Sequence, residues 1–114
     1  MTIKEVIKRA DELRPNAIEE EIKAAWVWTL DGDIANMMGT KHPADPFPQD
    51  AELLASHPHD EMYIFYLMAM IDTANRDSTL YANDSLLFNS AYGEAKASWR
   101  RANCPEKPQN WRVM

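Results

Sequence analysis

Residues 62–71 read MYIFYLMAMI, an unbroken run of ten apolar or aromatic side chains. No proline or glycine stands anywhere in residues 59–92, so nothing in the run itself stops a helix. A helix that is apolar all round is one that its neighbours cover on most sides. The run is about half the length that a bilayer-spanning helix requires, which argues against membrane contact. We therefore expect a central buried helix at about Glu61–Asn75, with Asp60 as its N-cap.

Two helices are expected before the central one. Thr2 and Glu5 form a capping-box pattern, and apolar side chains follow at helical spacing until Arg14-Pro15 ends the helix. Asn16 is the expected N-cap of the second helix, which should run on to Gly39. We expect one continuous helix, and the alternative is a bend or break at Asp31-Gly32-Asp33, where the interior glycine disfavours the helix. Its predicted apolar stripe consists of Ile18, Ile22, Trp26, Leu30, Ile34, Met37 and Met38.

A fourth helix is expected to start near Asp77 or Ser78 and to end before Pro105. Its predicted inner face consists of Tyr81, Asp84/Ser85, Phe88, Ala91/Tyr92, Ala95, Trp99 and Ala102. Residues 40–59 contain four prolines and form a long loop between the second and third helices, which Leu53 and Leu54 should pin to the core.

The predicted fold class is therefore all-α: a bundle of three to four helices around a central apolar helix. Residues 1–104 form one domain, and 105–114 form an extended C-terminal tail. The 114 residues carry 12 Lys and Arg against 18 Asp and Glu, a net charge of −6, which gives little electrostatic support for gripping DNA. The single cysteine, Cys104, excludes an internal disulfide and a Cys-rich zinc site.

The sequence indicates neither a catalytic site nor a metal-binding site. His42, His57 and His59 all lie in the proline-rich loop. The run from His57 to Asp60 offers two imidazoles and a carboxylate, but a zinc site wants three or four preorganised ligands, so we favour solvated loop histidines. Asp31-Gly32-Asp33 resembles the opening of a calcium loop, yet it lacks the glycine and glutamate that such a loop needs later. We predict no enzyme, no metal and no cofactor.

Asp72 is the acid that needs an explanation, because it follows the ten apolar residues of the central helix. A buried carboxylate requires a partner, such as an arginine, a tyrosine hydroxyl or a helix end. We expect Asp72 to be buried and paired in a structural role, since no second group at a recognisable spacing suggests catalysis.

Candidate interface residues are the aromatic and apolar side chains with no obvious place in the core. Trp26 and Trp28 are two positions apart, so they cannot share one face of a helix, and one of them lies under the loop or is exposed. Exposed aromatic residues often dominate binding energy. The candidates are Trp28, Phe47, Trp111 and Val113, although packing onto the domain's own surface is an equal alternative for the tail.

Several short patterns, taken together, resemble a known family. They are Arg14-Pro15-Asn16; Trp26 followed by Leu30-Asp31-Gly32; Tyr63-x-x-Tyr66-Leu67-Met68-Ala69; Ile71-Asp72 with Ala74-Asn75; and Phe88-Asn89-x-Ala91-Tyr92 leading to Trp99-Arg100-Arg101. The chain resembles the small helical head–tail connector (adaptor) proteins of tailed phages and prophages. The resemblance covers about residues 1–102.

This resemblance implies a structural protein of the virion head–tail junction, assembled in the bacterial cytoplasm. It implies a homo-oligomeric ring of about a dozen copies beneath the portal protein, with a tail-side connector or stopper docked below. DNA would pass through the ring without specific binding. The acidic composition fits such a channel, because negative charge repels phosphate.

Two other functions stay open. The first is a small helical regulator that binds a phage or bacterial protein through the same aromatic residues. The second is a helix-turn-helix DNA-binding protein built from the first two helices. The second is disfavoured because the second helix opens with Glu19, Glu20 and Glu21, where phosphates would approach.

Overall fold

The computed structural model describes residues 1–42 and 52–102, and the regular structure in these two stretches is helical apart from one isolated β-bridge. The helices are α1 (Ile3–Leu13), α2 (Glu20–Met38), α3 (Glu61–Ala74) and α4 (Ser78–Ala102). The all-α prediction is thus confirmed.

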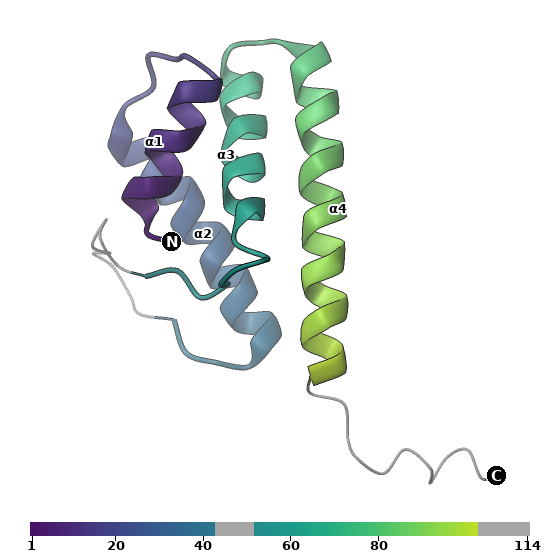
Figure 1. The fold of residues 1–114 in the computed structure, drawn as a ribbon. Helices are drawn as coiled ribbons and strands as arrows, with labels where there is room; N and C mark the ends of the chain where they lie inside the picture. Colours follow the sequence, from purple (N-terminus) through teal and green to yellow (C-terminus); the bar gives the residue numbers. More distant parts are fainter. Residues whose placement is uncertain (43–51, 103–114) are drawn as a thin grey trace, which may run out of the picture.

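Helix α3 is the centre of the bundle, as its apolar sequence predicts. It contacts each of the other three helices, and in Figure 1 α1 and α2 lie on one side of it and α4 on the other. Because three helices pack against it, α3 buries side chains around most of its circumference. The core consists of Ile3, Val6, Ile7, Ala10, Ala24, Val27, Trp28, Leu30, Ile34, Leu53, Ala55, Met62, Tyr63, Ile64, Leu67, Met68, Ile71 and Ala95.

Helix α1 begins and ends as predicted. The Thr2 side chain accepts a hydrogen bond from the Glu5 N–H, and the Glu5 carboxylate accepts one from the Thr2 N–H at 2.8 Å, which completes the capping box. Arg14 is the C-cap, directly before Pro15.

The end of the long loop is attached to the start of α1. The Leu53 N–H donates to the Met1 carbonyl at 3.0 Å, and Glu52 forms an isolated antiparallel bridge with Thr2. Leu53 and Ala55 are buried. Leu53 therefore pins the loop to the core, as predicted, while residues 43–51 lie outside the described part of the chain.

The predicted start of α2 is wrong, and its predicted stripe is right only in part. The helix begins at Glu20 rather than after Asn16, because the Asn16 side chain is engaged with Asp11 and Lys23 instead of capping a helix.

Of the stripe, Leu30 and Ile34 are buried, and Ile18 and Trp26 are half-buried against the core. Ile22, Met37 and Met38 are instead 44%, 41% and 38% exposed, and Lys23 and Asp31 are buried. The helix is continuous through Gly32 to Met38, without a bend or break there.

The caps of α3 and α4 differ from each other. Asp60 makes no side-chain cap, because its backbone is already in the helical region, where the side chain does not reach the first free N–H groups. Asp77 does cap α4: its carboxylate accepts a hydrogen bond from the Leu80 N–H at 3.0 Å.

Helix α4 packs against α3 along one face, as Figure 1 shows, and buries fully only Asp84 and Ala95 of its 25 residues. Phe88, Ala91, Tyr92 and Trp99 are half-buried against the core, as expected, whereas Tyr81 is exposed. Most of the surface of this long helix therefore faces away from the bundle.

Candidate functional site

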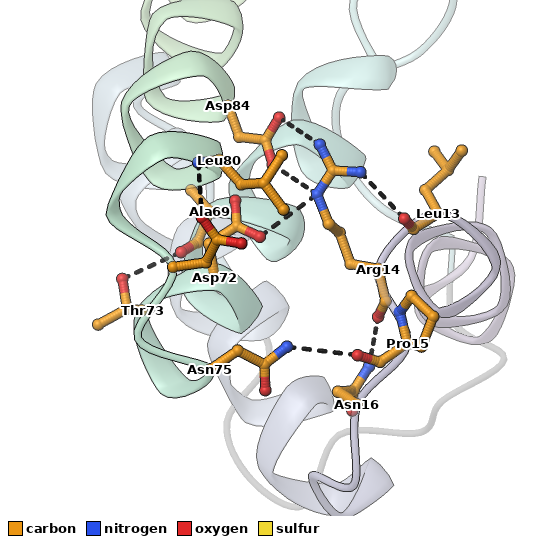
Figure 2. Close-up of polar contacts among 11 residues, drawn as sticks. Leu13, Arg14, Pro15, Asn16, Ala69, Asp72, Thr73, Asn75, Leu80 and Asp84 are labelled. Carbon is orange, nitrogen blue, oxygen red and sulfur yellow. Dashed lines mark hydrogen bonds and ion pairs between the residues drawn. The ribbon is translucent and has the colours of Figure 1, made fainter.

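The clearest polar centre lies where α1, α3 and α4 meet, and it is built around Arg14 (Figure 2). The Arg14 Nε and Nη2 atoms donate to the two carboxylate oxygens of Asp84, both at 3.0 Å. Arg14 Nη1 also donates to the Leu13 carbonyl at 2.9 Å. Asp84 is fully buried, so this two-pronged contact connects the end of α1 to the interior face of α4.

Asp72 occupies the other side of the same guanidinium. Its Oδ1 lies 3.3 Å from Arg14 Nε, and the side chain is 1% exposed. This confirms the prediction that Asp72 is a buried, paired acid. Within the described residues, however, neither carboxylate oxygen of Asp72 accepts a hydrogen bond, so the contact with Arg14 is an ion pair only while Asp72 is charged.

One positive charge is thus shared by two buried carboxylates. Burial, together with the adjacent carboxyl of Asp84, raises the pKa of Asp72 to about 7. Asp72 therefore carries a proton in the acidic range and loses it as the pH rises through about 7. Both acids are almost inaccessible from solvent, which suits a tie between helices.

The turn after α1 is also held by the end of α3. The Asn75 side-chain amide donates to the Pro15 carbonyl at 3.3 Å, and the Asn16 amide donates to the Arg14 carbonyl at 2.9 Å (Figure 2). The patterns Arg14-Pro15-Asn16 and Asp72 with Asn75, distant in sequence, therefore meet in space. They fix how α1 sits against α3 and α4.

Lys23 forms a second tie, between α1 and α2. Its ammonium donates to both carboxylate oxygens of Asp11, at 2.8 and 2.9 Å, and to Asn16 Oδ1 at 3.1 Å. Lys23 is 4% exposed. With these three acceptors its buried charge is compensated.

A third buried centre holds the long loop. The Tyr63 hydroxyl donates to Asp31 Oδ1 at 2.6 Å, and the same oxygen accepts the Leu54 N–H at 3.0 Å. The Ala55 N–H donates to the Tyr63 hydroxyl oxygen at 2.9 Å. Burial and the bond to Asp31 raise the pKa of Tyr63, so its proton stays in place. Asp31, which the sequence suggested only as part of a helix irregularity, is thus the anchor of the loop.

His42 completes this centre from the start of the loop. Its Nε2 lies 3.0 Å from Asp31 Oδ2, and its ring lies against Trp28 with centroids 4.0 Å apart. Trp28 is only 9% exposed. The proposal of Trp28 as an exposed interface residue is therefore wrong, because Trp28 is the tryptophan that lies under the loop, and Trp26 is half-buried.

The remaining predicted residues are the histidines considered as metal ligands and three candidate interface residues. Among residues 1–42 and 52–102, no three His, Cys, Asp or Glu side chains are grouped so that they would hold a metal ion. His59 instead makes an edge contact with Trp99, at 6.1 Å between centroids. Phe47, Trp111 and Val113 lie outside the described residues.

The surface carries apolar side chains that the bundle leaves open. Leu86 and Leu87 on α4 are 68% and 43% exposed. We call these two residues the α4 patch, and Tyr81, which is also exposed, lies on a different side of the helix. Met37 and Met38, at the end of α2, form a second exposed pair, the α2 patch. Exposed side chains of this size are candidates for contacts with another protein.

Comparison with known proteins adds no relative: no family model, no curated protein and no solved structure matches the chain. None of the helices α1–α4 combines the length and the apolar character that crossing a membrane requires.

Proposed function

We propose that this protein is a structural subunit of a phage or prophage head–tail junction. In this role, copies assemble into a ring under the portal protein and extend the DNA channel toward a tail-side connector. The proposal starts from the resemblance of residues 1–102 to the connector family. The structure adds that two groups of the resembling residues converge, one at Arg14, Asp72 and Asn75 and another at Asp31 and Tyr63.

The observation that carries the proposal is the exposure of apolar residues on two separate elements. The α4 patch and the α2 patch lie on different helices, and Leu86 is 68% exposed. A ring requires two different surfaces on each copy, because each subunit contacts one neighbour with one surface and the other neighbour with the second. A chain with two such patches fits that requirement.

The charge of the chain also supports a channel role. The net charge of −6 makes the surface unattractive to phosphate, so DNA would slide past without being held. The buried ties at Arg14 and Asp31 give the subunit a fixed shape, which a closed ring needs at every interface.

The test is the mass of the full chain in solution. Sedimentation and native mass spectrometry over a range of concentrations should show assembly into one closed ring, alone or with a phage portal protein. Leu86→Asp should weaken assembly at least about tenfold, because a buried interface leucine is replaced by a charge. Ala25→Asp, at an exposed position of α2 away from both patches, adds the same charge and should assemble normally.

A chain that stays monomeric at every concentration and ignores the portal would contradict the proposal. The same exposed residues also suit a small regulatory protein that binds a different partner. A one-to-one complex with such a partner, without ring formation, would favour that alternative.

A further inference from the structure

One carboxyl group of the cluster at Arg14 accepts no hydrogen bond. Asp72 is 1% exposed, and both of its carboxylate oxygens are without a hydrogen-bond donor among the described residues. Arg14 directs its Nε and Nη2 atoms to Asp84 and its Nη1 atom to the Leu13 carbonyl (Figure 2). A buried carboxylate without hydrogen bonds is costly while it is charged. This arrangement therefore suits the neutral form of Asp72.

Neutral Asp72 has a hydrogen-bond acceptor beside it. The carboxylate of Asp84 lies within hydrogen-bond reach of the Asp72 side chain and can accept its O–H. Burial, then Asp84, and also the negative charge of Asp77 raise the pKa of Asp72 to about 7, while Arg14 acts in the opposite direction. These charged groups come from the end of α1, from α4 and from the turn before α4. None of the ion pairs that they form within the described residues involves α2.

The turn between α3 and α4 brings a second arginine close to Asp72. Helix α3 ends in a Schellman motif, in which the Asp77 N–H donates to the Asp72 carbonyl at 3.0 Å and the Arg76 N–H donates to the Thr73 carbonyl at 3.1 Å. Arg76 takes the left-handed position of this motif, with a φ of 59°, which glycine usually occupies. Because a side chain at that position costs free energy, the backbone does not explain why an arginine stands there.

A hollow of about 330 Å³ lies against this turn. Its lining consists of Asp72, Thr73, Arg76, Asp77, Ser78 and Tyr81. Arg76 is exposed, and its guanidinium forms no ion pair with any other described residue. The hollow has room for several water molecules. Beside Asp72 there is therefore space both for water and for the Arg76 guanidinium.

We propose that Asp72 is a proton-operated switch between two partners. In its neutral form it donates to Asp84 and stays in the Arg14 cluster. When its O–H bond breaks, the proton passes to water in the hollow, and the charged carboxylate turns toward the guanidinium of Arg76. Arg14 then holds Asp84 alone, so α3 loses a contact with the end of α1 and gains one within its own C-terminal turn. The switch goes beyond the proposed function and operates within a single subunit, whether or not rings form.

The first test is the stability of the full chain with Arg76 replaced. Arg76→Gln removes the charge and Arg76→Lys keeps it, and both retain the same cost of the left-handed backbone. In urea unfolding at pH 8, Arg76→Gln should lower the folding equilibrium constant at least about threefold, and Arg76→Lys less than about 1.5-fold. At pH 5, where Asp72 is neutral, neither variant should differ measurably from the parent chain.

Asp72→Asn supplies the matched control, because asparagine has no charge for Arg76 to meet. In that background, Arg76→Gln should have no effect at either pH. An equal loss at pH 5 and pH 8, or an equal loss with and without Asp72→Asn, would overturn the proposal. So would Arg76→Lys behaving like Arg76→Gln, since the charge would then not be what acts.

Carbon-13 NMR of the carboxyl groups is a second, independent measurement. The resonance that disappears in Asp72→Asn identifies Asp72, and its pKa should lie well above the ordinary aspartate value of about 3.9. Arg76→Gln should raise the pKa of Asp72 by about 0.5, which is the same threefold factor on the pH scale. An ordinary pKa in the parent chain, or one that Arg76→Gln leaves unchanged, would overturn the switch. Neither test measures assembly, so failure of the switch is distinct from failure of the proposed function.

Discussion

At the scale of single residues, the most consequential side chain is Arg14, which serves two buried carboxylates at once. Asp84 takes both hydrogen bonds at 3.0 Å, and Asp72 is left with an ion-pair contact at 3.3 Å. The two acids are therefore unequal although both are buried. Asp84 accepts the two hydrogen bonds from Arg14, whereas burial and the neighbouring carboxyl of Asp84 raise the pKa of Asp72 to about 7.

Because the two acids differ in this way, replacing each of them by asparagine should change the stability of the fold in opposite directions. The pKa of Asp72 is about 7 in the folded chain and lower when unfolded, so the folded state binds more protons between those values. Stability contributed by Asp72 is therefore greatest in acid and is lost as the pH rises toward 7. Asp72→Asn should flatten this slope and raise the midpoint of thermal unfolding at pH 8, measured by circular dichroism from pH 4 to 8.

Asp84→Asn is the matched comparison. It leaves Arg14 without its two-pronged partner, and breaking a buried pair costs about 3–5 kcal/mol. Urea unfolding at pH 7 should show that loss. If both asparagine variants were equally destabilised at pH 8, the unequal sharing of Arg14 would be wrong.

A second residue-scale prediction concerns Gly93, in the middle of α4. A Cβ atom built there would meet nothing within 4 Å, and the residue is exposed. Alanine favours a helix over glycine by up to about 1 kcal/mol, so Gly93→Ala should stabilise the monomer slightly in urea unfolding. A clear loss of assembly in a stabilised Gly93→Ala chain would show that a neighbour packs against this position.

At the scale of elements, the loop between α2 and α3 is held by polar groups as well as by Leu53. Asp31 on α2 and Tyr63 on α3 together accept the backbone N–H groups of Leu54 and Ala55. The two helices thus fix the end of the loop before α3 begins. This arrangement makes the loop part of the core structure from residue 52 onward.

Tyr63→Phe should therefore destabilise the chain by about 1–3 kcal/mol, because the Ala55 N–H loses its acceptor and Asp31 loses a donor. Urea unfolding measures the loss, and faster hydrogen exchange at Leu54 and Ala55 would locate it. Tyr66→Phe is the control, since the Tyr66 hydroxyl makes no hydrogen bond with any described residue, and it should change stability by less than about 0.5 kcal/mol. Equal losses for both variants would contradict the anchoring role.

At the scale of the whole molecule, the ties at Arg14, Lys23 and Asp31 connect all four helices of the described chain. The core cluster of the described residues, 1–42 and 52–102, is formed by the four helices and the end of the loop before α3. Under the proposed function, we expect this core to provide the shape and residues 105–114 to serve assembly.

Deleting residues 105–114 should accordingly leave the fold intact and weaken assembly. We expect the thermal midpoint to fall by less than about 4 °C, which corresponds to less than 1 kcal/mol for a domain of this size. Calorimetry measures the midpoint, and sedimentation measures assembly. A large drop in the midpoint of the shortened chain would mean that the tail is part of the core.

The sequence by itself determined both ends of α1 and the central position of α3. The run at 62–71, the capping box at Thr2 and the break at Arg14-Pro15 are local signals, and local spacing governs where a helix forms and which helix is most covered. Asp72 was also predictable, because a charged group next to such a run has to find a partner.

Tertiary structure alone decided which polar groups meet. Arg14 and Asp84 are 70 positions apart and Asp31 and Tyr63 are 32 apart, and nothing near either member marks its partner. It also decided the inward face of α2, where buried Lys23 and Asp31 break the apolar stripe and place Trp28 under His42. The physical reason is that a polar side chain can form its hydrogen bonds with water or with another segment of the chain, and the sequence does not show which of the two it does.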